Sequence, residues 1–96
     1  MRVVAQLQLR ERRERDALVP DLVQAYRDAV QAFYDAGCRY LQFDDTAWAY
    51  LCSPEELEKA AARGIRTEGI GERYSAMLNA ILEAKPADMT ITTHVC

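Results

Sequence analysis

The sequence predicts an α/β fold in which two parallel strands are joined by a helical crossover. Three observations predict it: an amphipathic helix over residues 16–36, a strand just after it at residues 40–43, and a helix pair that leads to a second strand at residues 90–93. The length of 96 residues limits the chain to one domain with a modest core. A crossover of this length favours a parallel, right-handed connection, and functional groups then gather where the strands end.

The first helix is indicated by apolar residues that recur at spacings of three and four. Pro20 can occupy its first turn, and Gly37 is placed to end it. The segment before it, RERRERD at residues 10–16, alternates in charge sign, which favours a solvated helical face over a phosphate-binding surface.

The crossover contains two further predicted helices. In the stretch SPEE, Ser53 can cap a helix whose first residue is Pro54 and whose capping carboxylate is Glu56, and the helix should run to about Arg63. A second apolar stripe predicts a helix that Pro86 closes; its members are Ile70, Tyr74, Met77, Leu78, Ile81 and Leu82. We expect this stripe to be core.

Composition excludes several classes of function. The net charge of -3 disfavours nucleic-acid binding. No stretch approaches the ~20 apolar residues that span a bilayer, and the N-terminus does not read as a signal peptide, so we expect no membrane association and a cytoplasmic location. Three cysteines without a close C-x-x-C pair predict reduced thiols.

Unusual residues stand at the ends of both predicted strands. Asp44 and Asp45 close the first strand, and His94 and Cys96 close the second. Alternate residues of a strand share a face, so the imidazole and the thiolate could chelate zinc together. By spacing alone, a packed, hydrogen-bonded pair is the more common arrangement of such residues in a strand. The two acids could bind an ammonium group, act as a general base, or cap the next helix.

Two stretches, YRDAVQAFYDAGCRYLQFDDTAWAYL and PADMTITTHVC, resemble the cobalamin-independent methionine synthase family, in particular its shorter single-barrel relatives. In that family a strand of the form A-G-x-x-x-[IVL]-Q-[ILF]-D-[ED] is followed further along the chain by an H-x-C strand. The resemblance covers roughly residues 20–96. It implies a partial (β/α)8 TIM barrel, of which this chain supplies about two parallel strands with crossover helices.

The resemblance also implies a chemistry. Members of the family transfer a methyl group from 5-methyltetrahydrofolate, or its polyglutamate, to the thiolate of homocysteine and so form methionine. The resemblance implies zinc as cofactor, with His94 and Cys96 as two of its ligands. It implies that Asp44 contacts the amino group of the substrate. No role is carried over to Asp45, because the larger enzymes commonly have glutamate there.

The family's remaining zinc ligands, a glutamate and a second cysteine, have no counterpart in this sequence. We therefore expect a charged segment at residues 1–15 and, at residues 16–96, a fragment of such a barrel that is inactive alone. An inactive truncated remnant and a non-enzymatic barrel piece are the alternatives. A decarboxylase relative that needs no metal is a third, against which the H-x-C pair argues. Two strands with open edges also predict that the isolated chain self-associates.

Overall fold

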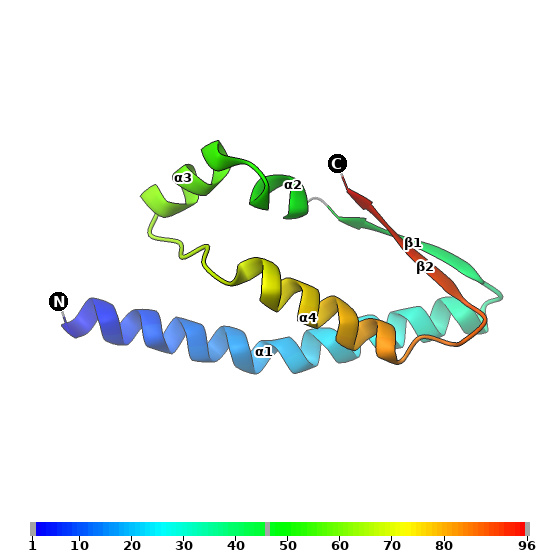
Figure 1. Ribbon diagram of the computed structural model, residues 1–96. Coiled ribbons are helices and arrows are strands. Elements are labelled where there is room, and N and C mark those ends of the chain that lie inside the picture. Colours follow the sequence, from blue (N-terminus) through cyan, green and yellow to red (C-terminus); the bar gives the residue numbers. More distant parts are fainter. Residues whose placement is uncertain (1, 46, 96) are drawn as a thin grey trace.

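The computed structural model describes residues 2–45 and 47–95, without the side chains at positions 2–5, 7, 8 and 11. In chain order its elements are α1 (Arg2–Asp35), β1 (Tyr40–Asp45), α2 (Ala47–Leu51), α3 (Pro54–Ala62), α4 (Ile70–Glu83) and β2 (Thr90–Val95). The molecule is elongated, with extents of 53 × 28 × 17 Å, because α1 runs along its whole length (Figure 1).

The sheet consists of β1 and β2 alone in the part of the chain that the structure describes. The strands pair in parallel, from Tyr40 opposite Thr90 to Asp45 opposite Val95. The parallel pairing confirms the prediction, but the expected partial (β/α)8 barrel is wrong. Two strands leave both outer ladders open, and the described helices do not close them into a barrel, so the fold is a small α/β unit.

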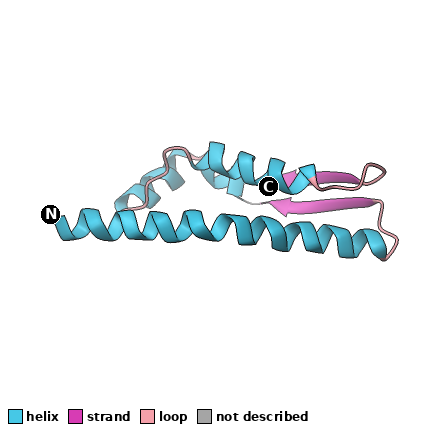
Figure 2. Cartoon of the chain, turned by 90° about the horizontal axis from the view of Figure 1, so that it is seen from below, coloured by secondary structure: helices cyan, strands magenta, loops and turns pink. Residues whose placement is uncertain are grey.

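The molecule has two layers, a sheet and a pair of helices. Helices α1 and α4 lie along the same face of the sheet, and the other face carries no helix (Figures 1 and 2). Burial alternates along β1, since Leu41 and Phe43 are half-buried while Tyr40, Gln42 and Asp44 are exposed. The exposed set therefore lies on the helix-free face, as the two-residue period of a strand requires.

Helix α1 is longer than predicted. It begins at Arg2 and passes through Pro20, which stands in its interior and not in its first turn. Its charged half contains an ion pair one turn apart, between Arg10 and Glu14 at 3.2 Å. The helix is continuous across residues 15 and 16, so the division of the chain at that point stays a prediction.

Helix ends follow the predicted capping residues closely. Gly37 has a φ of 103°, which glycine adopts readily, and the amide of Cys38 donates to the carbonyl of Phe33 at 2.9 Å, so α1 ends as expected. At α3 the amide of Glu56 donates to Oγ of Ser53 at 3.4 Å. The short helix α2 was not predicted.

The core is small and lies where α1, α4 and the sheet meet. Val30, Ile81 and Met89 are its buried hydrophobic residues among those described. Beside this core a hydrogen bond joins α1 to α4: Nε of Arg27 donates to the carbonyl oxygen of Ala80 at 2.8 Å. The predicted stripe on α4 is core only in part, because Ile81 is buried and the half-buried Met77 packs against it, whereas Leu82 is exposed.

The described helices include none that is long and apolar enough to cross a membrane.

Candidate functional site

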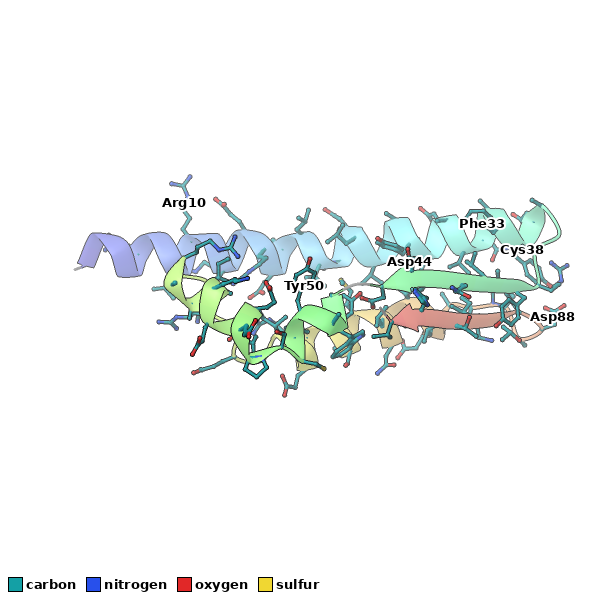
Figure 3. All side chains as sticks on the ribbon, turned by 90° about the horizontal axis from the view of Figure 1, so that it is seen from above. Arg10, Phe33, Cys38, Asp44, Tyr50 and Asp88 are labelled. Atoms are coloured by element: carbon teal, nitrogen blue, oxygen red, sulfur yellow. The ribbon has the colours of Figure 1, made fainter. Side chains whose placement is uncertain are left out.

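The carboxyl ends of β1 and β2 lie side by side, and this brings two predicted site residues together. Asp44 is the direct register partner of His94. Paired residues of neighbouring strands project to the same face, so the carboxylate and the imidazole share the helix-free face of the sheet. Both residues are exposed, and Figure 3 shows Asp44 near the end of β1. Cys96, the other predicted zinc ligand, lies outside the described residues.

The residues at the strand ends offer part of the donor set that a zinc site needs. An exposed imidazole at a strand end suits zinc, and the adjacent carboxylate of Asp44 could also reach a metal or a cation. A tetrahedral site needs four donors, and no group of three or more potential ligands occurs within residues 2–45 and 47–95. His94 therefore fits as one ligand of a site whose other donors are not among the described side chains.

The other described cysteines, Cys38 and Cys52, lie outside both strands. Cys38 precedes β1, at the opposite end of the sheet, and its thiol donates to the carbonyl of Tyr40 at 3.2 Å. Cys52 is exposed just after α2. Both are free thiols, and neither belongs to the strand-end cluster.

Asp45 occupies a different environment from its neighbour Asp44. It is only 5% exposed, and both of its carboxylate oxygens are occupied. Oδ1 accepts from the backbone amide of Ala47 at 2.9 Å, and Oδ2 accepts from the hydroxyl of Tyr74 at 2.5 Å. The side chain thus ties the end of β1 to the start of α2 and to α4, which is a structural role that the sequence did not reveal.

Tyr74 is held in its protonated form by the same contact. Burial and the hydrogen bond to Asp45 raise the pKa of the Tyr74 phenol to about 12, so at neutral pH it is a hydrogen-bond donor. The ring also packs edge-on against Trp48 of α2, with centroids 5.2 Å apart.

The two acids therefore have separate tasks. Strand alternation turns Asp45 toward the helices, where Tyr74 immobilises it, and turns Asp44 toward the open face beside His94. The sequence contained a sign that Asp45 faces the helices, because Leu41, Phe43 and Asp45 are alternate residues of one strand and therefore share a face. Of the two acids, only Asp44 is exposed and able to contact a ligand on the helix-free face.

The sequence is similar to two proteins of Bacillus subtilis (strain 168), the uncharacterized proteins YxjG and YxjH. Each is 42% identical to this chain over 76 residues, which cover 79% of the chain and 20% of the relative. The chain thus spans about a fifth of the length of these relatives. Neither name states an activity, so the resemblance to methionine synthases stays a prediction.

No family model matches the chain. No solved structure matches it either, so no known barrel supports the barrel prediction.

Proposed function

We propose that this chain carries part of the active site of a zinc-dependent methyltransferase, which transfers a methyl group from 5-methyltetrahydrofolate or its polyglutamate to the thiolate of homocysteine and forms methionine. The observation that carries the proposal is the pairing of Asp44 with His94 on an exposed face at the carboxyl ends of parallel strands. A possible metal ligand and a possible ammonium-binding acid are thereby adjacent, as this chemistry requires.

Each residue has a defined task in this proposal. His94 and Cys96 would hold zinc, which when bound lowers the pKa of a substrate thiol so that the thiolate is available at neutral pH. Asp44 binds the ammonium group of the amino acid and so orients its sulfur. Asp45 and Tyr74 touch no substrate; they fix the end of β1 so that Asp44 keeps its position.

The activity belongs, in this proposal, to a longer protein. The chain spans about a fifth of the relatives' length, and the described residues do not supply four zinc ligands. An inactive remnant is the alternative, and methyl transfer by the longer protein separates the two. We further propose a cytoplasmic location, which suits the free thiols of Cys38 and Cys52.

Cobalt(II), which takes the place of zinc and gives a thiolate charge-transfer band, tests the ligands without relying on activity. The longer protein that contains this segment should show this band, and Cys96→Ser should remove most of the bound cobalt, because a hydroxyl is a far poorer ligand than a thiolate. Cys52→Ser is the matched control, since it removes another thiol outside the site. A band that survives in Cys96→Ser and disappears in Cys52→Ser would refute the assignment.

Asp44→Asn tests the substrate contact in the longer protein that contains this segment. Metal content should be unchanged, while kcat/KM for homocysteine should fall about tenfold or more, because a charge-assisted hydrogen bond to the ammonium is lost. Asp21→Asn, at an exposed acid on α1, is the matched control and should leave both the metal content and kcat/KM unchanged. Loss of metal from Asp44→Asn would instead make this acid a ligand.

We also propose that the isolated chain self-associates through its open strand edges. Both strands have a ladder without a partner among the described residues, and such edges pair readily with other chains. Sedimentation velocity at increasing concentration should show growing species. A compact monomer at all concentrations would exclude this.

A further inference from the structure

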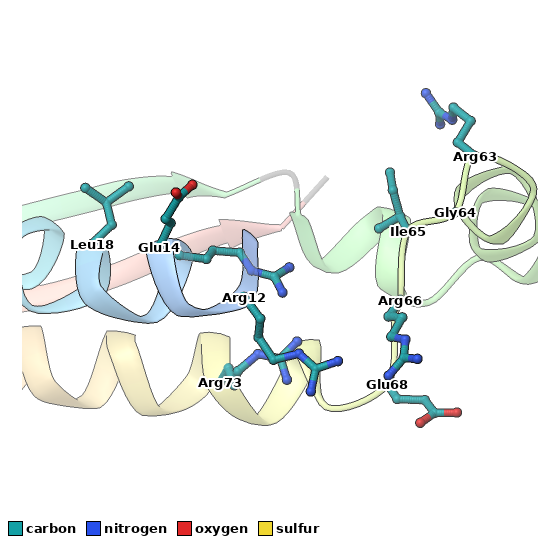
Figure 4. A pocket seen from close by; sticks show the side chains of 10 residues that line it. Arg12, Glu14, Leu18, Arg63, Gly64, Ile65, Arg66, Glu68 and Arg73 are labelled. Carbon is teal, nitrogen blue, oxygen red and sulfur yellow. The ribbon is translucent and has the colours of Figure 1, made fainter. Parts of the chain in front are cut away.

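Five arginines surround one pocket near the end of the molecule where α1 begins. The pocket has a volume of about 630 Å³ and lies between α1, α4 and the segment that joins α3 to α4 (Figure 4). Arg12 and Arg15 come from α1, Arg63 and Arg66 from that connecting segment, and Arg73 from the start of α4. Residues about fifty positions apart in sequence thus line one pocket. The Arg63 side chain points away from Arg12 and Arg73 (Figure 4), and its Nε donates to the carbonyl of Lys59 at 3.4 Å.

The concentration of positive charge here is unusual for this chain. The whole sequence has a net charge of -3, whereas the pocket combines five arginines with only two acids, Glu14 and Glu68. Glu14 is already paired with Arg10, outside the pocket, at 3.2 Å. Like charges brought together raise the free energy of the fold, and a bound anion would remove that repulsion.

The start of α4 adds a second feature that favours an anion. Its cap, Gly69, has a φ of 72° and no side chain that accepts from the first amides, in the part of the chain described. Amides at a helix N-terminus carry partial positive charge and bind anions. Arg73 reaches back over this glycine so closely that a Cβ there would lie 3.1 Å from its Nη1. A guanidinium group therefore lies beside the start of α4. Residues 69–72 do not themselves line the pocket, and the amide of Ile70 already donates to the carbonyl of Thr67 at 3.3 Å, so Arg73 is what this helix end contributes to the pocket.

We propose that this pocket binds a small multivalent anion that bears phosphate or carboxylate groups. Guanidinium groups bind both chemistries in a bidentate manner, and several groups converging from three segments suit a ligand with more than one charge. The volume is that of a small-molecule site. The overall negative charge of the chain argues against nucleic acid as the ligand.

This site is separate from the strand-end cluster, since Asp44 and His94 are not among the residues that line it. The pocket also changes the interpretation of RERRERD, residues 10–16, which the sequence predicted to be a solvated helical face and nothing more. Arg12 and Arg15 alone would support that interpretation, but the structure adds three arginines from the other side of the pocket.

Calorimetric titration of the 96-residue chain with pyrophosphate and, separately, with citrate tests the proposal. At low salt at least one should bind, and Arg66→Gln and Arg73→Gln should each weaken that binding about tenfold, the usual loss for one charge-assisted hydrogen bond. Arg13→Gln is the matched control: it removes the same charge next to Arg12 but does not line the pocket, so the Kd should change less than about twofold.

Each outcome of the titrations supports or overturns the proposed anion site. Tighter binding of pyrophosphate identifies a phosphate ligand, and tighter binding of citrate a carboxylate ligand; both support the shared chemistry. Binding of neither at millimolar concentration overturns the proposal, as does equal weakening by Arg13→Gln, which would mean diffuse attraction. A duplex oligonucleotide that binds more tightly than both probes would overturn it in favour of a nucleic-acid surface.

A second measurement needs no variant and so does not depend on variant folding. Phenylglyoxal modifies exposed arginines, and mass spectrometry locates the modified positions. The probe that binds should slow modification of Arg12, Arg66 and Arg73 several-fold and leave Arg13 unchanged. Equal rates at all four positions with and without the probe would refute the site.

Discussion

The two halves of this molecule differ in how their side chains are packed. In the half with the sheet, Val30, Ile81 and Met89 are at most 3% exposed. In the other half, α2 and α3 contain no buried residue, and Leu18 of α1 is 52% exposed. The strand-end cluster therefore rests on the packed half, which can hold Asp44 and His94 in fixed positions. The arginine pocket lies in the open half, where a ligand could itself order the side chains.

The largest expected effect comes from the core. Met89→Ala should lower the free energy of unfolding by about 2–5 kcal/mol, because it leaves a cavity where the most buried side chain stood. Leu18→Ala, the matched truncation in the open half, should cost about 0.5 kcal/mol or less. Urea denaturation followed by circular dichroism measures both. Equal costs would mean that the two halves are packed alike.

An intermediate effect is expected at the contact between β1 and α4. Tyr74→Phe leaves Oδ2 of the buried Asp45 without its donor, and should cost about 1–3 kcal/mol. Tyr50→Phe is the control, because Tyr50 is 58% exposed and the same hydroxyl is removed there. Denaturation midpoints of the two variants give the comparison, and a Tyr74→Phe midpoint equal to that of Tyr50→Phe would show that the contact does not support the sheet.

The smallest effect is a pH dependence between about pH 10 and 12. The pKa of Tyr74 is raised in the fold from 10.0 to about 12, so the unfolded chain loses the phenolic proton first. Stability from this group is complete below pH 10 and is lost as pH rises toward 12. The wild-type chain should therefore lose more stability in this window than Tyr74→Phe. If stability fell equally with pH in the wild type and in Tyr74→Phe, the fold would not raise the pKa of the Tyr74 phenol.

Local patterns in the sequence predicted much of this structure. The cap at Ser53, the end of α1 at Gly37 and the parallel pairing of the strands each depend on a few neighbouring residues or on crossover length. The same local patterns placed Asp44 and His94 at the ends of their strands, but the register that makes them direct neighbours came from the structure. The start of α1 was missed because residues 2–15 are rich in charge and carry no clear apolar stripe; an ion pair one turn apart, Arg10 with Glu14, lies there.

Contacts between distant segments could not be predicted in this way. The hydrogen bond from Tyr74 to Asp45 joins residues 29 positions apart, and the arginine pocket joins α1 to residues beyond position 62. Neither the hydrogen bond nor the pocket corresponds to a pattern within a short stretch of the sequence. The barrel prediction was wrong for the same reason: closure depends on how many strands pair, which the pattern of two strands does not determine.

Pro20 inside α1 has a consequence for how this helix opens. Proline has no amide hydrogen, so the carbonyl of Asp16, one turn earlier, lacks its helical donor. The hydrogen-bond chain of the 34-residue helix is interrupted at the point where the packed half gives way to the open half. We therefore expect unwinding that starts at the N-terminus to stop near Pro20 without disturbing Val30, so that the helix opens as two segments of unequal stability.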